Sequence, residues 1–368
     1  MNFRPTSRSS AASLHEMTSQ DQTTPLNGLG YLLDKRYLLH NPGQEHPESP
    51  QRLIAIQQVL KEVSAEERWQ ILKPRKATLD ELVLVHDPAY VESIEKAVKR
   101  APVCLDPDTP VSVESYEIAL LATGGVLKCI DSVCSGTLRK VFAFVRPPGH
   151  HAGRAVAGGF CLFNNIAVAA AYARSHYGLE RIAIVDFDVH HGNGTQSCFY
   201  GDPNTLYIST HQYPFYPGSG NFNETGSGSG KGYSLNFPLP EGAGDSNFVP
   251  IYSQIIPTVL DQYAPQLILV SAGFDGHFSD ILGGLRLTKD GYASAAASLI
   301  ATAERLCNGR ICFILEGGYN MQALKDCTAA IMAEMETRLP HKISIPEGSV
   351  YREISRQAAK FTAGLWKW

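Results

Sequence analysis

The chain contains five short apolar runs, and longer segments with helical spacing lie between them. The runs cover residues 140–145, 181–185, 205–209, 266–270 and 310–315 and are rich in β-branched and aromatic residues. Near-continuous apolarity over such lengths is typical of parallel strands buried on both faces. Apolar residues recur at helical spacing over residues 163–175, 247–262 and 292–306. The alternation predicts an α/β fold whose mostly parallel central sheet is flanked by helices.

The segments outside this alternation predict one domain with a tail. From residue 28 onward there is no long linker and no internal repeat, so we expect a single domain over residues 28–368, with a flexible loop at the glycine- and serine-rich stretch 218–232. Residues 1–27 are polar, and Arg4 and Arg8 precede the first acid, Glu16. We interpret them as a disordered or docked tail. An organelle presequence is the weaker alternative, and no hydrophobic signal region follows the arginines.

Composition narrows the function classes. Thirty-two basic against 36 acidic residues give a net charge of −4, so no electrostatic footprint for nucleic acid is expected. No apolar run approaches the roughly 18 residues of a spanning helix, which argues against membrane insertion. The 8 cysteines form no CxxC pair, and we interpret them as reduced, buried thiols of a cytoplasmic protein.

Each apolar run is followed at once by residues that a hydrophobic core does not tolerate. The sequences are RPPGHH, DFDVHHGNG, STH, SAGFDGH and EGGY. In open α/β sheets, ligands bind beyond the carboxyl ends of the strands. We therefore expect these clusters, although far apart in sequence, to meet in one functional site.

Three residues in these clusters suit a metal ion. In DFDVHHG, Asp186, Asp188 and His190 alternate by two, which places them on one side of an extended segment. Asp188 and His190 can then face one ion, and Asp275 at another strand end supplies a third ligand. Three protein ligands with an open position are typical of catalytic zinc, which polarises a carbonyl and holds water.

The remaining polar residues suit acid–base catalysis. His150 and His151 follow a diproline and offer a base beside the metal, although alone they could simply form a hydrogen-bonded turn. Asp186 and Asn193 are available to orient the two rings. Tyr319, after two glycines, could donate a hydrogen bond to an oxyanion.

The other histidines are expected to have no catalytic role. We interpret His191 and His277 as supporting or structural residues, because they lie inside the clusters but fit no ligand position. Solvent-facing or capping roles are predicted for five histidines outside the clusters: His40, His46, His86, His176 and His341.

Taken together, these motifs resemble the zinc-dependent histone deacetylase superfamily, which has the arginase/deacetylase fold, and within it the class II-like bacterial amidohydrolases. HPESPxR (46–52), RPPGHHA (146–152), GFCLFNN (159–165), DFDVHHGNGT (186–195), SAGFDGH (271–277) and LEGGY (315–319) occur in the family's order. The resemblance runs from about Tyr31 to about Ala330. It implies a histone deacetylase-like catalytic domain within residues 28–368.

The resemblance also implies roles at matching positions. Asp188, His190 and Asp275 match the zinc ligands, and of the tandem pair His150 and His151 the second is usually the general base and acid. Asp186 and Asn193 match the partners of that pair, and Tyr319 matches the tyrosine that stabilises the oxyanion. The implied substrate contacts are the tunnel walls Phe160 and Tyr216, the Gly159 carbonyl, the apolar Leu282, and Arg52 beneath the metal.

Structural potassium is implied as well. The nearer site would use Asp186, main-chain oxygens of Asp188 and His190, and Ser209 and Thr210. A second site would involve Phe199, Asp202, Thr205 and Tyr233, although Asp202 departs from the commoner pattern. Asp106 or Asp108 would be the acidic rim residue that grips the substrate backbone.

The implied activity is hydrolysis of acetyl or related acyl groups on lysine side chains. Water held by zinc attacks the amide, a histidine transfers the proton, and Tyr319 stabilises the oxyanion. The substrate would be acylated lysine in a protein or peptide, or an acetylated small amine. An acetylpolyamine deacetylase is the nearest alternative, and Leu282 disfavours it because a cationic substrate would prefer an acidic wall. A two-manganese ureohydrolase and a non-catalytic acyl-lysine-binding protein are more remote. The oligomeric state stays open, with a homo-oligomer among the options.

Overall fold

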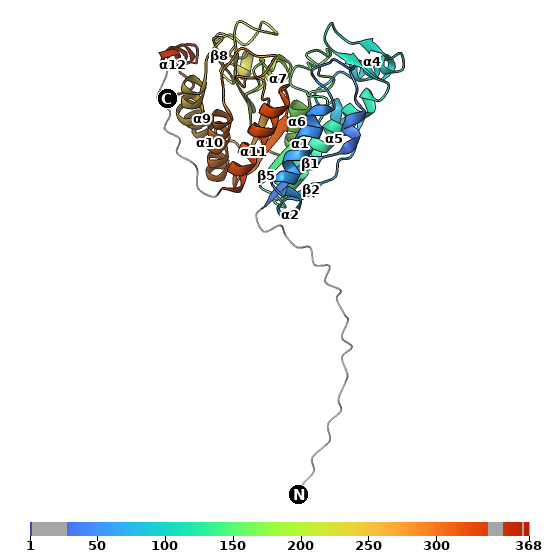
Figure 1. Ribbon diagram of the computed structural model, residues 1–368. Coiled ribbons are helices and arrows are strands. Elements are labelled where there is room, and N and C mark those ends of the chain that lie inside the picture. The colour runs from blue at the N-terminus through green and yellow to red at the C-terminus, as the bar shows by residue number, and fades with distance from the viewer. Residues whose placement is uncertain (2–27, 338–348, 363, 368) are drawn as a thin grey trace.

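An eight-stranded parallel sheet forms the centre of the protein (Figure 1). The computed structural model describes residue 1 and residues 28–337, 349–362 and 364–367, so the predicted tail falls outside it apart from Met1. In spatial order the strands are β2 (Gln70–Leu72), β1 (Leu29–Leu33), β5 (Lys140–Phe144), β10 (Ile311–Leu315), β9 (Leu267–Ala272), β6 (Ile182–Asp186), β7 (Thr205–Gln212) and β8 (Ser234–Leu239). The predicted fold class is confirmed.

The five predicted strands are the five neighbours β5, β10, β9, β6 and β7. Every one of these pairings is parallel, and Asp186 at the end of β6 lies opposite Ser209 of β7 and Ser271 of β9. Because the strands run in the same direction, their carboxyl ends share one edge of the sheet. The other three strands of this sheet, β1, β2 and β8, were not predicted; they lie outside this central group, and they are short or contain glycine, asparagine or proline.

Helices cover the sheet in two groups. The contacting helices α1 (Gln51–Glu62), α11 (Met321–Glu336), α10 (Lys289–Cys307) and α9 (Ile256–Tyr263) form one row, and α5 (Ser115–Cys134) and α6 (Asn165–Tyr177) form the other. Shorter or peripheral elements include α2 (Ala65–Arg68), α3 (Leu79–Leu82), α4 (Pro88–Val98), α7 (Asn193–Phe199), α12 (Ser349–Phe361), the 3₁₀ turns η1 (Lys35–Leu39) and η2 (Gly228–Gly230), and the pair β3 (Val103–Cys104) and β4 (Pro110–Val111).

The helix predictions needed two corrections. The helix expected over 163–175 begins at Asn165, because the Asn164 side chain caps it by accepting a hydrogen bond from the Ala167 amide. The helical stretch expected over 247–262 is present, but it is not a uniform α-helix. It divides into α8 (Asp245–Pro250), a π-helical turn η3 (Ile251–Ile255) and α9. Pro250 and Pro257 lack the N–H group that a continuous helix needs at those positions.

Two expectations from composition can be compared with the structure. Among the described residues, no helix is both long and apolar enough to cross a membrane. All eight cysteines are free thiols, and Cys104 departs from the expectation of burial because it is exposed.

Candidate active site

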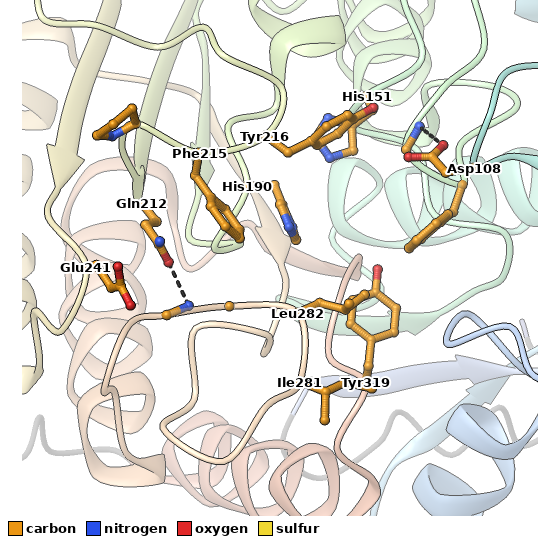
Figure 2. Close-up of a pocket in the computed structure, with 15 residues that line it drawn as sticks. Asp108, His151, His190, Gln212, Phe215, Tyr216, Glu241, Ile281, Leu282 and Tyr319 are labelled. Atoms are coloured by element: carbon orange, nitrogen blue, oxygen red, sulfur yellow. Dashed lines mark hydrogen bonds between the residues drawn. The ribbon is translucent and has the colours of Figure 1, made fainter.

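A pocket of about 610 Å³ lies beyond the carboxyl ends of the central strands (Figure 2). His151 comes from the loop after β5, His190 from the loop after β6, and Tyr319 from the loop after β10. These residues are far apart in sequence, and the strand order brings them together as the sequence predicted. Phe160, Tyr216 and Leu282 line the same pocket.

Asp188, His190 and Asp275 form a compact triad on the pocket floor. Their ligand atoms lie within 4.8 Å of one another, and His190 Nδ1 is 3.1 Å from both Asp188 Oδ1 and Asp275 Oδ2. The expected reason for this convergence is wrong. β6 ends at Asp186, and residues 188–190 follow in a bend rather than an extended strand. Asp188 and His190 converge because Asp188 Oδ1 accepts a hydrogen bond from the His190 amide at 2.9 Å.

Backbone amides hold the two carboxylates in place. Gly317 N–H donates to Asp188 Oδ2 at 2.8 Å, and Val189 N–H donates to Asp275 Oδ1 at 2.9 Å. A side chain at Gly317 would collide with both carboxylates, so this close approach of backbone to carboxylate requires glycine.

The donor set fits a divalent cation. Asp188 and Asp275 are almost fully buried, and burial together with the neighbouring Asp188 raises the pKa of Asp275 to about 7. Two buried carboxylates so close together need a compensating positive charge. Two oxygen ligands and one imidazole nitrogen, open to a pocket, match the ligand types of a catalytic zinc site.

The two adjacent histidines have different partners. His150 Nδ1 lies 3.0 Å from Asp186 Oδ2, and His151 Nδ1 lies 2.8 Å from Asn193 Oδ1. Both predicted pairings are therefore present. Burial lowers the pKa of His151 well below its usual value, and His150 adds to this effect. For His150, burial also acts to lower the pKa, but Asp186 and Asp188 outweigh it and raise the pKa to about 10.

Tyr319 is positioned by its backbone. Its amide donates to Asp280 Oδ2 at 2.7 Å, and the neighbouring Asn320 amide donates to the same oxygen at 2.8 Å. Burial raises the pKa of the Tyr319 hydroxyl well above its usual value, so the group stays protonated. Arg52 packs beneath the ring, with its guanidinium carbon 5.0 Å from the ring centroid. Figure 2 shows the hydroxyl pointing into the pocket.

The pocket wall at Phe160 has a strained backbone. Phe160 has φ +69°, an uncommon conformation for a residue with a bulky side chain. Two acceptors from the segment after β3 hold the turn. Asp108 Oδ1 accepts from the Gly159 amide at 3.1 Å, and Thr109 Oγ1 accepts from the Phe160 amide at 3.0 Å. Of the two rim candidates, Asp108 lines the pocket and Asp106 does not.

Beneath the site lies a buried charge cluster in which sequence reasoning assigned a role to Arg52 but none to Glu48 or Arg146. The Glu48 carboxylate contacts Arg146 and Arg52, and all three side chains are fully buried. Burial acts to raise the pKa of Glu48, but the two arginines lower it to about 2. Arg52 also donates to the Gly318 carbonyl at 2.7 Å. The cluster thus anchors the glycine segment that precedes Tyr319.

Glu316 is a second missed residue. It directly follows β10, is fully buried, and accepts a hydrogen bond from the Gly149 amide at 2.7 Å, which fixes the backbone ahead of the histidine pair. An acid placed immediately after an apolar run, as Asp186 is after residues 181–185, was the signal that could have identified it.

The two proposed sets of potassium ligands have different surroundings in the structure. Ser209 lies opposite Asp186, and Thr210 Oγ1 is 3.5 Å from the Asp186 carbonyl, so the nearer set gathers oxygen atoms. In the second set, the Asp202 carboxylate already pairs with the Arg174 guanidinium. The Arg174 guanidinium therefore supplies a positive charge at Asp202, which is the position that departs from the commoner potassium-site pattern.

The remaining histidines support the fold. His191 contacts Ser219 and Gln196, and His277 contacts Ser279, as expected for structural residues. A solvent-facing role for His40 and His86 is wrong, because both are buried, but His40 does stand at the C-cap of η1, one of the capping roles expected. His40 contacts Ser115 and Glu48, and His86 joins the Gly153 carbonyl to the Asn164 amide. His341 lies outside the described residues.

The fold and this pocket define a deacetylase-type amide hydrolase, and comparison with known proteins agrees. The chain belongs to the histone deacetylase family, since the model of the histone deacetylase domain matches residues 46–335. A probable deacetylase of Archaeoglobus fulgidus is 41% identical over 83% of this chain and 86% of its own length. The mouse polyamine deacetylase HDAC10 is 38% identical over 75% of this chain, which spans 43% of that protein. The crystal structure of the HDA15 HD domain superposes with a TM-score of 0.84 at 33% identity, covering 92% of this chain and 95% of that one.

Proposed function

We propose that the protein is a zinc-dependent lysine deacylase, which hydrolyses acetyl or related acyl groups on lysine side chains in proteins or peptides. The observation that carries the proposal is one pocket lined by His190 of the triad, His151 and Tyr319. These residues supply a metal ligand, a base and a hydrogen-bond donor in a single cavity, as amide hydrolysis requires.

The reaction assigns a role to each side chain. Zinc bound by Asp188, His190 and Asp275 would polarise the amide carbonyl and make water more acidic. His151 accepts the proton of the attacking water at Nε2, because Asn193 engages its Nδ1, and then passes that proton to the leaving lysine nitrogen. The protonated Tyr319 hydroxyl donates to the carbonyl oxygen as negative charge develops there. His150, held by Asp186, keeps positive charge beside the site.

The tunnel and its support complete the assignment. Phe160 and Tyr216 flank the acyl-lysine chain, the Gly159 carbonyl accepts from the scissile amide, and Leu282 forms an apolar wall. Arg52 anchors the segment that carries Tyr319 and would face the acetate product. One structural potassium ion at Asp186, Ser209 and Thr210 belongs to the same proposal. A cytoplasmic location is proposed from the eight free cysteines.

An acetylpolyamine substrate is the second candidate, favoured by the similarity to the mouse polyamine deacetylase. Leu282 argues against it, because this wall residue carries no charge to bind a cationic substrate.

The test compares purified full-length protein on three substrates, namely an acetyl-lysine peptide, a longer acyl-lysine peptide and acetylspermidine. We expect hydroxamate-sensitive turnover with the highest kcat/KM on an acyl-lysine peptide. Faster hydrolysis of acetylspermidine would establish the polyamine alternative. Binding of acyl-lysine peptide without turnover, in protein shown to contain zinc, would establish a binding protein instead.

A further inference from the structure

The pocket extends past the proposed tunnel into a side lobe lined by Gln212, Pro214, Phe215, Glu241 and Gly284. The Phe215 ring separates this lobe from the triad. It stacks on the His190 ring with centroids 5.4 Å apart and an interplanar angle of 17°. In Figure 2, Phe215 stands between His190 and the Gln212–Glu241 pair. None of the lobe residues has a role in the proposed reaction.

Hydrogen bonds and a glycine keep the side lobe open. The Gln212 side chain is 5% exposed, and its Oε1 accepts a hydrogen bond from the Gly284 amide at 2.7 Å. A methyl group at Gly284 would lie 2.9 Å from Glu241 Cγ and 3.0 Å from Gln212 Oε1. Any side chain at this position would therefore crowd the two polar groups, and backbone alone forms this part of the lining.

The charges around the pocket favour a cation. Within the part of the chain that the structure describes, the exposed Glu241 carboxylate forms no hydrogen bond or ion pair. Asp108 lines the opposite side, and the lining contains no lysine or arginine. A carboxylate can only accept hydrogen bonds, and the neighbouring Phe215 ring offers a face to a positive charge. An amine or a guanidinium group meets both requirements.

We propose that the side lobe binds the basic side chain of a lysine or arginine close to the acyl-lysine in the substrate peptide. Glu241 is the residue that selects it, and Gln212 holds the lobe in shape. This inference rests on the proposed lysine deacylase function, and it adds a charge preference that the tunnel residues do not provide.

A peptide series tests the side lobe directly. Each acetyl-lysine peptide carries a single arginine, or its neutral isostere citrulline, at one of four positions. These are the two residues before the acetyl-lysine and the two residues after it. In the wild type, we expect arginine at one position to raise kcat/KM about two- to fivefold over citrulline, the range of a partly exposed ion pair. Glu241→Gln should abolish this preference and leave the citrulline peptide unchanged. Added salt should weaken the preference.

Two controls make the result specific. Glu66→Gln removes one exposed charge on α2, outside the pocket, and should retain the arginine preference. Glu241→Lys should reverse it, favouring glutamate over glutamine at the same position, as expected for a direct pair.

Three outcomes would overturn the inference. They are equal turnover of arginine and citrulline peptides at all four positions, an arginine preference that survives in Glu241→Gln, and a Glu241→Gln effect confined to acetylspermidine. Because the citrulline peptides report deacetylation itself, their hydrolysis separates failure of the side lobe from failure of the proposed function.

Discussion

The floor and the mouth of the pocket are built differently. On the floor, Asp188 and Asp275 are buried and accept hydrogen bonds from backbone amides, and Asn193 holds the ring of His151. At the mouth, Ile281 is 70% exposed and Tyr216 is 41% exposed. The floor therefore has one geometry fixed from several directions, whereas the mouth consists of exposed side chains with few constraints.

This difference separates two properties of the protein. Buried groups that contact the reacting atoms determine whether the amide is hydrolysed. Removal of one such group loses all of the transition-state stabilisation that it provides. Exposed groups act through a screened, solvated contact, and each changes the choice of substrate only slightly. The following predictions test this division, beginning with the largest expected effect.

Loss of a floor carboxylate should cause the largest change. Asp275→Ala removes one of the three proposed zinc ligands, so we expect metal content to fall far below one zinc per chain. Turnover should fall by about a thousandfold or more, since a metal ion contributes several kcal/mol to such reactions. Elemental analysis and kcat/KM measure the two effects. Asp261→Asn, which changes an exposed acid paired with Arg305, is the control. Full zinc occupancy in Asp275→Ala would contradict the ligand assignment.

Removal of the Tyr319 hydroxyl should leave the zinc content unchanged but greatly slow hydrolysis. Tyr319→Phe keeps the ring over Arg52 and the backbone bond to Asp280. We expect kcat to fall about 10²–10³-fold, the usual cost of one oxyanion donor, with zinc content unchanged. A fully active variant would exclude Tyr319 from the reaction.

The sequence could predict the floor because its residues lie at or shortly after the ends of buried strands. Asp186 ends β6, the histidine pair follows β5, and Tyr319 follows β10. The strand order then brings these loops together, so the apolar pattern and the residue types predicted which residues meet, although not the bend that aligns Asp188 with His190.

The supporting residues and the mouth give no such signal. Asp280 holds an amide 39 positions away in the sequence, and no periodicity relates the two. The φ of Phe160 depends on hydrogen bonds from residues about 50 positions earlier. The side lobe joins Gln212 at the end of β7 with Glu241 and Gly284 from two separate loops. Such contacts are set by tertiary packing, which local sequence does not encode.

The buried His86 should make the free energy of unfolding depend on pH. Burial lowers the pKa of His86 to about 4 from its usual 6.5. Between these values the unfolded chain binds a proton that the folded chain does not, so stability falls as pH drops from about 6.5 to about 4. The loss at this site is on the order of 3 kcal/mol.

Chemical denaturation at several pH values, with a chelator present throughout, measures this slope. In His86→Asn the slope between pH 6 and 4.5 should be smaller by about 1.4 kcal/mol per pH unit. His176→Asn, at an exposed position, should keep the wild-type slope. Equal slopes for all three proteins would show that His86 binds its proton alike in the folded and unfolded states.

Substitution of Asp280 tests whether a residue that only positions Tyr319 has a smaller but measurable effect on kcat. Asp280→Asn weakens the acceptor that fixes the Tyr319 and Asn320 amides. We expect kcat to fall about tenfold, as is usual for residues that orient a reacting group, while KM changes little. Combined with Tyr319→Phe, the substitution should cause little further loss, because both act on the same hydroxyl. Additive losses would assign Asp280 a separate role.

The mouth should show the smallest effect on the reaction itself. Ile281→Ser replaces a 70% exposed apolar residue of the pocket rim, so unfolding free energy should change by no more than about 0.5 kcal/mol. On one reference acetyl-lysine peptide we expect kcat/KM to change less than about threefold, since only a partly solvated apolar contact is lost. The order of preference among peptides with apolar or polar neighbours of the acetyl-lysine should nevertheless change. A loss as large as that of Tyr319→Phe would mean that the mouth takes part in the chemistry, and the division between floor and mouth would not hold.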